Sequence, residues 1–266
     1  MKSKILLIGI DGINLETALE TSPTITALKD SGYFTALTMQ VPTWSGPGWS
    51  TILTGSSHEQ HGVRDNTLVG HKLLHRPDLL SLAYYQDQST TTFAAAGWPP
   101  LVDPNGHGPI IQERREQQKA YRHRVIARDG ETYGYTAVDA EIYQASLFAI
   151  ENFAPDVSFV YFCGVDEAGH LFGSVGDQYR AAISRIDSFI ANLLKAVQVR
   201  ASADEPWLVV LTTDHGHINA GGHGGESAQE RASFVIAQGF GRANPVWPES
   251  FEPHELTRLL LAERVK

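Results

Sequence analysis

The sequence predicts an α/β fold, a doubly wound and mainly parallel sheet with helices on both faces. Two observations lead to this prediction. Four short apolar runs, each ending where polar residues begin, are typical of strands buried on both faces, and they cover residues 4–10, 157–163, 207–213 and 232–237. Helical patterns lie between these runs, and strands that alternate with helices form doubly wound sheets.

The helices are predicted from their ends and their apolar stripes. Residues 22–32 begin with Ser22 and Pro23, an N-cap and a proline at the first helical position, and they stop at Gly32. Residues 137–153 form a second helical pattern. The clearest pattern runs over residues 178–197, where apolar residues recur on one stripe. A last helix is expected over residues 253–263.

The length of 266 residues fits a single α/β domain over residues 1–266. Residues 67–135 break the alternation of strands and helices, with prolines at 77, 99, 100, 104 and 109. This segment is therefore expected to be an insertion that flanks the active site.

Composition and charge exclude several classes of protein. With 42% hydrophobic and 19% charged residues, the chain is expected to be soluble and globular, without membrane association. A net charge of −9 argues against binding to a nucleic acid polymer or an anionic membrane. A small anionic substrate would need local positive charge, which bound metal ions supply. Cys163 is the single cysteine, so it forms no intramolecular disulfide and is expected to be a small buried side chain.

The first apolar run is too short for a secretory signal. It follows Lys4, covers six residues and ends at Asp11. We interpret it as the first buried strand, and a cytoplasmic protein is the expectation.

Carboxylates and imidazoles gather just past three of the predicted strands. The set is Asp11, Asp166, His170, Asp214, His215 and, in a glycine-rich loop, His223. Ligands collect beyond the carboxyl ends of strands in open α/β sheets. One zinc ion takes about four ligands, so six suit two ions that share bridging oxygens. An isolated Asp after a strand is more often a helix N-cap, and only the set as a whole favours metal.

Six segments in order resemble the motifs of the alkaline phosphatase superfamily, closest to its nucleotide pyrophosphatase/phosphodiesterase branch. They are IGIDG at 8–12, PTWSGPGWSTILTG at 42–55, HGVRDN at 61–66, PDVSFVYFCGVDEAGHLFG at 155–173, TTDHGH at 212–217 and GGHGG at 221–225. The resemblance implies two divalent ions, expected to be Zn²⁺. One ion would be held by Asp11, Asp214 and His215, and the other by Asp166, His170 and His223. His217 matches no ligand of the family and is left out.

The resemblance also implies a nucleophile and a phosphate-binding amide. Counting back ten positions from Gly55 gives Ser45, which would also bind the first metal as an alkoxide. The N-terminus of a helix through residues 49–53 would stabilise that alkoxide and a phosphate. Asn66 follows Ser45 by 21 positions, as does the Asn of the phosphodiesterase branch that contacts a non-bridging oxygen. Trp44 stands where monoester-cleaving relatives have Asp, which favours diesters.

The expected function is therefore that of a two-metal phosphodiesterase or nucleotide pyrophosphatase with a phosphoseryl intermediate. Its substrate would be a small phosphoester, with nucleotides among the candidates, and the oligomeric state stays open. A phosphomonoesterase or phosphonate hydrolase on the same site is the alternative. A sulfatase is less favoured, because Trp49 replaces the Arg of that motif and His215 suits zinc better than calcium. A non-catalytic binder of metal or nucleotide is a further alternative.

Overall fold

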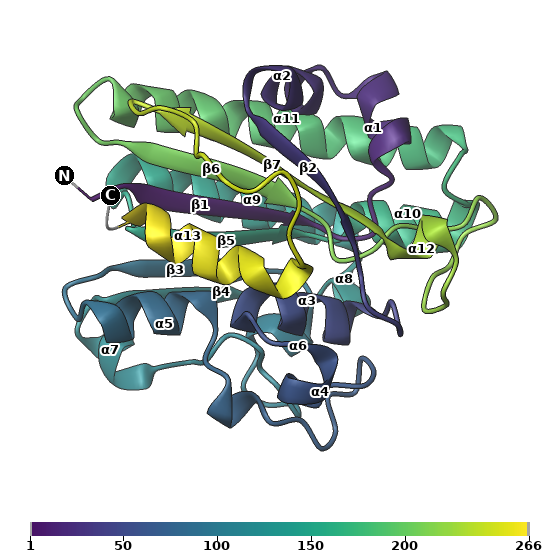
Figure 1. Cartoon of the computed structure of the whole chain (residues 1–266), viewed down its shortest axis with the longest axis horizontal. Helices are drawn as coiled ribbons and strands as arrows, with labels where there is room; N and C mark the ends of the chain where they lie inside the picture. The colour runs from purple at the N-terminus through teal and green to yellow at the C-terminus, as the bar shows by residue number, and fades with distance from the viewer. Residues whose placement is uncertain (1, 265–266) are drawn as a thin grey trace.

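A sheet of seven strands runs through the residues that the computed structural model describes, 2–264 (Figure 1). Its strand order is β2-β7-β6-β1-β5-β3-β4. The strands are β1 (Lys4–Ile10), β2 (Tyr33–Thr38), β3 (Thr92–Ala96), β4 (His123–Ala127), β5 (Val157–Phe162), β6 (Trp207–Thr212) and β7 (Ala232–Phe240).

The sheet is mainly parallel, as predicted. Strands β6, β1, β5, β3 and β4 are parallel neighbours. Strand β7 is antiparallel to both β6 and β2. The α/β class is confirmed, and β7 makes the sheet mixed.

Helices cover both faces because residues of β1 alternate between two apolar layers. Ile5 and Leu7 pack in a cluster with residues of α3 (Ser45–Thr54), α5 (Leu79–Gln86), α6 (Pro99–Val102) and α13 (Leu256–Arg264). Leu6 and Ile8 pack in a second cluster with residues of α1 (Leu15–Thr21), α2 (Pro23–Ser31), α9 (Tyr135–Asn152), α10 (Gly164–Phe172) and α11 (Asp177–Ala201). Short elements complete the chain: α4 (His58–His61), η1 (Leu73–His75), α7 (Arg115–Lys119), α8 (Gly130–Tyr133), α12 (Ala228–Arg231) and η2 (Pro253–Glu255).

All four strands and the main helices expected from the sequence are present. The helices predicted over residues 137–153 and 178–197 are α9 and α11, and the one over 253–263 is η2 followed by α13. Strands β2, β3 and β4 were not predicted. Strand β3 reads TFAAA, in which three alanines weaken the strand pattern, and β2 and β4 are only partly buried.

Residues 67–135, expected to be an insertion, also contribute two strands to the central sheet. This segment supplies β3 and β4, and β3 pairs directly with β5 in the central sheet. Its prolines lie outside these two strands. The segment is thus partly a continuation of the sheet, and its loops alone depart from the strand and helix pattern.

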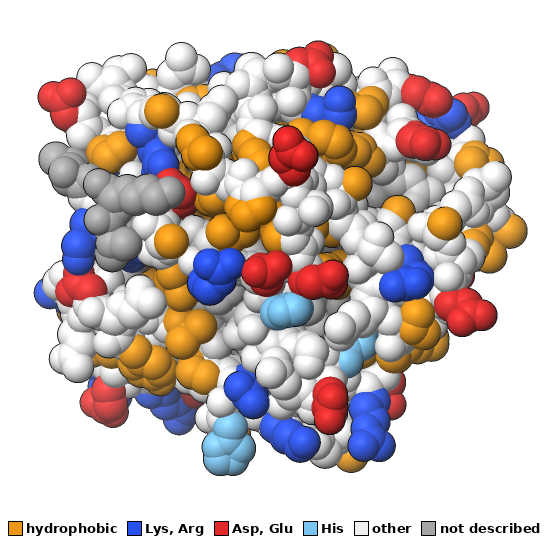
Figure 2. All heavy atoms as spheres, in the orientation of Figure 1, with side chains coloured by type: hydrophobic (Ala, Val, Ile, Leu, Met, Phe, Trp, Pro, Cys, Tyr) orange, Lys and Arg blue, Asp and Glu red, His pale blue; other side chains and the backbone are white. Residues whose placement is uncertain are grey.

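One face of the surface mixes charges of both signs. Figure 2 shows Lys and Arg side chains scattered among Asp and Glu on this face rather than gathered into a strip. Among the described residues, no helix combines the length and apolarity needed to span a bilayer.

Candidate metal centre

The carboxyl ends of three adjacent strands bring the candidate ligands to one place. Strand β1 lies between β5 and β6, with Ile10 paired to Phe162 and Gly9 paired to Thr212. Asp11 follows β1, α10 follows β5, and the segment after β6 begins at Thr213. Because these strands are parallel neighbours, residues distant in the sequence meet beyond their ends.

The first group consists of Asp11, Asp214, His215 and Ser45. The ligand atoms of Asp11, Asp214 and His215 all lie within 4.8 Å of one another. His215 Nε2 lies 3.2 Å from Asp11 Oδ1 and 3.4 Å from Asp214 Oδ2. The Ser45 hydroxyl oxygen lies 3.2 Å from His215 Nε2 and 3.5 Å from Asp11 Oδ1. The structure therefore brings together the four residues expected at the first ion.

Asp214 is the strongest sign that this group needs a cation. Both of its carboxylate oxygens are buried, and neither has a hydrogen-bond partner among the described residues. Burial and the charge of Asp11 raise the pKa of Asp214 well above its ordinary value. A fully buried carboxylate without a hydrogen bond is costly even with the His215 imidazole 3.4 Å away, and a divalent ion would remove that cost. The donor set fits zinc, which binds imidazole nitrogen and carboxylate oxygen.

Asp11 is oriented by two donors that the sequence did not reveal. Trp49 Nε1 donates to Asp11 Oδ2 at 2.8 Å, and the Tyr161 hydroxyl donates to the same oxygen at 2.6 Å. Oδ1 is left facing Ser45 and His215. Trp49 lies one helical turn after Ser45 on α3, which is the only signal in the sequence that it shares the nucleophile's face.

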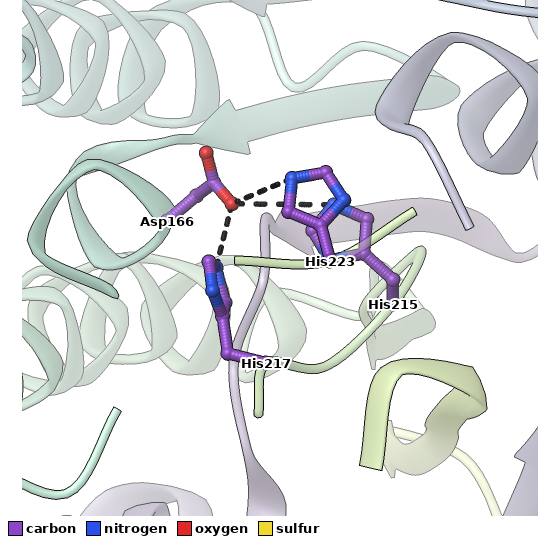
Figure 3. Close-up of side chains that lie close together, drawn as sticks. All are labelled: Asp166, His215, His217 and His223. Atoms are coloured by element: carbon purple, nitrogen blue, oxygen red, sulfur yellow. Dashed lines mark hydrogen bonds and ion pairs between the residues drawn. The ribbon is translucent and has the colours of Figure 1, made fainter. Parts of the chain in front are cut away.

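The second group is centred on Asp166, and Figure 3 shows the contacts of Asp166 with His215, His217 and His223. Asp166 Oδ1 lies 3.6 Å from His223 Nε2, and Asp166 Oδ2 lies 3.5 Å from His170 Nε2. The Nε2 atoms of His170 and His223 are 3.0 Å apart. The three residues expected at the second ion therefore lie together. The His170 side chain is 44% exposed, so this group opens to solvent on its side.

Backbone carbonyls set the tautomers of two of the candidate ligand histidines. His223 Nδ1 lies 2.7 Å from the Thr43 carbonyl oxygen, and His215 Nδ1 lies 3.1 Å from that of Gly216. A carbonyl only accepts, so each Nδ1 carries a proton, and in the neutral ring Nε2 keeps its lone pair for a metal. Both Nε2 atoms point into the site, as a metal centre requires.

The local charges agree with this arrangement. Burial would lower the pKa of His215, but Asp214 and Asp11 raise it to about 10. Burial and the charge of His215 lower the pKa of His223 to about 4. Burial opposes ionisation of Asp166, yet the hydrogen bond from His217 and the charge of His215 hold its pKa below the ordinary value. The raised pKa of His215 thus indicates that the carboxylates of Asp11 and Asp214 favour a positive charge between them.

His217, which was left out of the predicted set, contacts Asp166 directly. His217 Nε2 lies 2.8 Å from Asp166 Oδ1, and His217 Nδ1 accepts a hydrogen bond from the Gly222 amide at 3.0 Å. Because Nδ1 accepts, the proton of the neutral ring lies on Nε2 and points at Asp166. His217 therefore orients Asp166 and the loop that carries His223, and its Nε2 offers no lone pair to a metal. In the sequence, this role is indicated by the position of His217 two residues after His215.

Asp139 is a second residue that sequence reasoning missed. Its carboxylate on α9 accepts hydrogen bonds from the Cys163 amide at 3.1 Å and the Gly164 amide at 2.8 Å. These amides lie at the start of α10, which has no side-chain cap of its own. Asp139 thus fixes the helix that carries Asp166 and His170.

The nucleophile candidate begins a buried helix. Ser45 is the first residue of α3, and Trp44 before it provides no side-chain cap. Asn66 Oδ1 instead accepts a hydrogen bond from the Gly46 amide at 2.8 Å. The structure therefore places Asn66 beside Ser45 at the N-terminus of α3, where backbone amides and the helix dipole favour anions.

A family model and two curated relatives match this chain in sequence. The family model for type I phosphodiesterase/nucleotide pyrophosphatase matches residues 5–225. GPI ethanolamine phosphate transferase 2 of Schizosaccharomyces pombe is 30% identical over 100 residues, which cover 36% of this chain and 13% of the relative. Alkaline phosphatase PhoD of Zymomonas mobilis is 31% identical over 111 residues, covering 42% and 16%. The chain thus spans a small part of the length of these curated relatives.

Solved structures show the same fold at low sequence identity. Phosphonoacetate hydrolase from Sinorhizobium meliloti, in complex with phosphonoformate, superposes with a TM-score of 0.71 at 11% identity, covering 99% of this chain and 96% of that one. Murine ectonucleotide pyrophosphatase/phosphodiesterase 5 in complex with AMP gives 0.58 at 20% identity, covering 81% and 57%. A 2-O GAG sulfatase gives 0.65 at 12% identity, covering 98% and 71%. At these identities the likeness shows the fold alone.

Proposed function

The chain belongs to the type I phosphodiesterase/nucleotide pyrophosphatase family, within the alkaline phosphatase superfamily, and from this we propose that it is a two-metal phosphohydrolase. The observation that carries the proposal is the first group, where the Ser45 hydroxyl faces His215 and Asp11 beside the buried carboxylate of Asp214, which has no hydrogen-bond partner among the described residues. A hydroxyl beside two buried carboxylates and an imidazole is the arrangement needed for a metal-dependent attack on phosphorus.

Two Zn²⁺ ions are the proposed cofactors. Asp11, Ser45, Asp214 and His215 would hold the first, and Asp166, His170 and His223 the second. When bound, such ions neutralise the carboxylates and stabilise the oxygens that enter and leave phosphorus.

Ser45 and the helix it begins are proposed to carry the covalent step. The Ser45 hydroxyl gives its proton to solvent, and its Oγ forms a bond to phosphorus while the bond between phosphorus and the leaving oxygen breaks. The leaving group departs with that electron pair and takes up a proton, and a phosphoseryl enzyme remains. Water then forms a bond to phosphorus as the bond to Ser45 Oγ breaks, which releases the phosphate product and returns a proton to the Ser45 hydroxyl. The N-terminus of α3 stabilises negative charge on the bound phosphoryl oxygens through its dipole.

Asn66 is proposed to donate to a non-bridging oxygen of the substrate. Its Oδ1 is engaged by the Gly46 amide, which fixes the orientation of the side-chain amide. Its Nδ2 makes no hydrogen bond to any described residue, so it is available to a phosphoryl oxygen beside Ser45.

A small phosphodiester or nucleotide pyrophosphate is the proposed substrate. The net charge of −9 supports a small ligand over a nucleic acid polymer. Phosphonate or phosphomonoester hydrolysis is the second candidate, since the phosphonoacetate hydrolase shares this fold over nearly the full length of both chains. The cytoplasmic location stays a prediction of the sequence.

Substitution of Asn66 by alanine tests the preference for diesters. If its amide donates to the developing charge of the transition state, the variant should lose both kcat and kcat/KM for bis(4-nitrophenyl) phosphate, by roughly 10²–10³. Steady-state kinetics on this diester and on 4-nitrophenyl phosphate measure the effect, with zinc content as the control. A wild-type enzyme that cleaves the monoester far faster, and an Asn66→Ala variant that matches it, would favour the monoesterase alternative.

Metal dependence is tested by removal and return of the ions. A chelator should abolish turnover, and zinc should restore it, because carboxylate and imidazole ligands together favour this ion. The measurement is activity against added Zn²⁺, Mg²⁺ or Ca²⁺ after dialysis. Full activity in the chelated protein, or recovery with Ca²⁺ alone, contradicts the zinc assignment.

A further inference from the structure

Asp139 is a fully buried carboxylate that belongs to neither group of candidate metal ligands. It lies on α9 with an exposed fraction of 0%. Its Oδ1 accepts a hydrogen bond from the Cys163 amide at 3.1 Å, and its Oδ2 accepts one from the Gly164 amide at 2.8 Å. Burial of a charged group is costly unless hydrogen bonds compensate it, and these two bonds tie the carboxylate to the start of α10.

The close approach of Asp139 to the backbone depends on Gly164. A Cβ at this position would lie 2.7 Å from Asp139 Oδ2 and 3.0 Å from Arg185 Nη2. Only a residue without a side chain leaves room for the carboxylate beside its own amide. The contact therefore requires both residues, Asp139 as the acceptor and a glycine as the donor.

Helix α10 depends on Asp139 because its own N-cap residue provides no side-chain acceptor. That residue is Cys163, which makes no cap hydrogen bond to the first turn. Free amides at a helix start need an acceptor, and Asp139 supplies one from a different helix. At the opposite end, the amide and hydroxyl of Ser174 donate to the carbonyls of Asn219 and Ile218. Contacts from two distant segments thus fix the position of α10.

Helix α10 carries two of the three candidate ligands of the second group. Asp166 lies in its first turn, and His170 follows four residues later on the same face. Asp166 Oδ2 and His170 Nε2 are 3.5 Å apart. The third candidate ligand, His223, lies in the loop after β6, so a displacement of α10 would move two ligands away from the third. No residue of the first group lies on α10.

We infer that Asp139 is a positioning residue for the second ion, and that it sets zinc affinity at the second group with little effect on the first. The inference rests on the proposed function and adds to it a control over the loading of one ion. Replacing the partners that orient metal ligands commonly weakens metal affinity by about 10- to 100-fold. A protein without the Asp139 carboxylate should therefore hold one ion at zinc concentrations that fill both sites of wild type.

Zinc titration of the metal-free protein measures the two sites separately. Burial raises the pKa of Asp139 to about 7, against the opposing effects of the two amides and Arg185, so a titration at about pH 8.5 keeps the carboxyl group ionised. Calorimetry should resolve two binding steps, which Asp214→Asn and His223→Ala assign because each removes a ligand of one group. In Asp139→Asn, we expect the Kd of the second group to rise about 10- to 100-fold and that of the first to stay within about threefold.

Asp187→Asn is the matched control for this titration. Asp187 on α11 is also buried, at 4% exposure, and its carboxylate accepts from the amides of Thr24 and Ile25 at the start of α2. The same chemistry therefore caps a helix that carries no candidate ligand. This variant should lose a similar amount of thermal stability and keep both zinc Kd values close to those of wild type.

A second variant keeps the inference testable if Asp139→Asn folds poorly. Gly164→Ala leaves the carboxylate in the chain and pushes it away from the amide, so it should weaken the second site in the same selective way. Hydrogen exchange of the metal-free proteins gives a readout without zinc. The amides of α10 should exchange faster in the Asp139 and Gly164 variants than in Asp187→Asn.

The outcomes separate this inference from the proposed function. A selective rise in the second Kd supports the role of Asp139. Equal changes at both groups, an unchanged second Kd, or a matching change in Asp187→Asn overturns it. Wild type that binds two zinc ions and turns over no phosphoester overturns the proposed hydrolysis and leaves the role of Asp139 in place. Wild type that binds no second zinc ion overturns the two-metal assignment before any variant is compared.

Discussion

Replacement of Ser45 by alanine is expected to lower kcat/KM for a phosphodiester by about 10⁴-fold or more, with zinc still bound. The loss should be this large because the variant lacks the oxygen that bonds to phosphorus. Asp11, Asp214 and His215 remain to hold the first ion, so zinc content by elemental analysis should stay close to that of wild type. Quenched turnover of a phosphorylated substrate should leave label on Ser45 in wild type and none in the variant.

Ser50→Ala is the matched control for this experiment. Ser50 is the other buried serine of α3, and its hydroxyl has no hydrogen-bond partner among the described residues. This variant should retain wild-type turnover within a few-fold. Turnover of Ser45→Ala at a similar level would remove Ser45 from the mechanism, whereas lost turnover with lost zinc would reduce its role to that of a ligand.

Asp214→Asn is expected to lose one ion and, with it, activity by about 10³-fold or more, because the ligands of a two-metal site act as a unit. The same substitution removes a buried carboxylate that has no hydrogen-bond partner in the metal-free fold. The metal-free variant should therefore unfold at a temperature no lower than metal-free wild type. Elemental analysis, kinetics and thermal unfolding with and without zinc measure the three effects.

Zinc should raise the thermal midpoint of wild type. The rise should be smaller in Asp214→Asn. Binding to the folded state alone contributes about 2.7 kcal/mol when free ligand is 100 times its Kd. Asp30→Asn, which makes the same change at an exposed position of α2, should behave as wild type. A gain in thermal midpoint on adding zinc that is equal in wild type and Asp214→Asn would exclude Asp214 as a ligand.

The candidate ligands that follow the strands could be predicted from the sequence, because the end of each apolar run marks the end of a strand. Asp11 follows six apolar or small residues, and Asp214 follows the run that becomes β6. Parallel strands carry their carboxyl ends to one edge, so the positions of these residues in the sequence are enough to predict that they meet. Ser45 and Asn66 came from the order and spacing of motifs, which an isolated serine or asparagine would not have provided.

Other features depended on contacts between distant segments. Strands β2, β3 and β4 lack a strong strand pattern, and pairing with neighbours in the sheet makes them strands. The role of His217 follows from its hydrogen bond to the Gly222 amide, since that bond fixes which nitrogen carries the proton. The sequence alone determined which residue types reach the strand ends. Only the tertiary structure decided what each does there, because a tautomer, an orphaned carboxylate or a helix cap is defined by its neighbours in space.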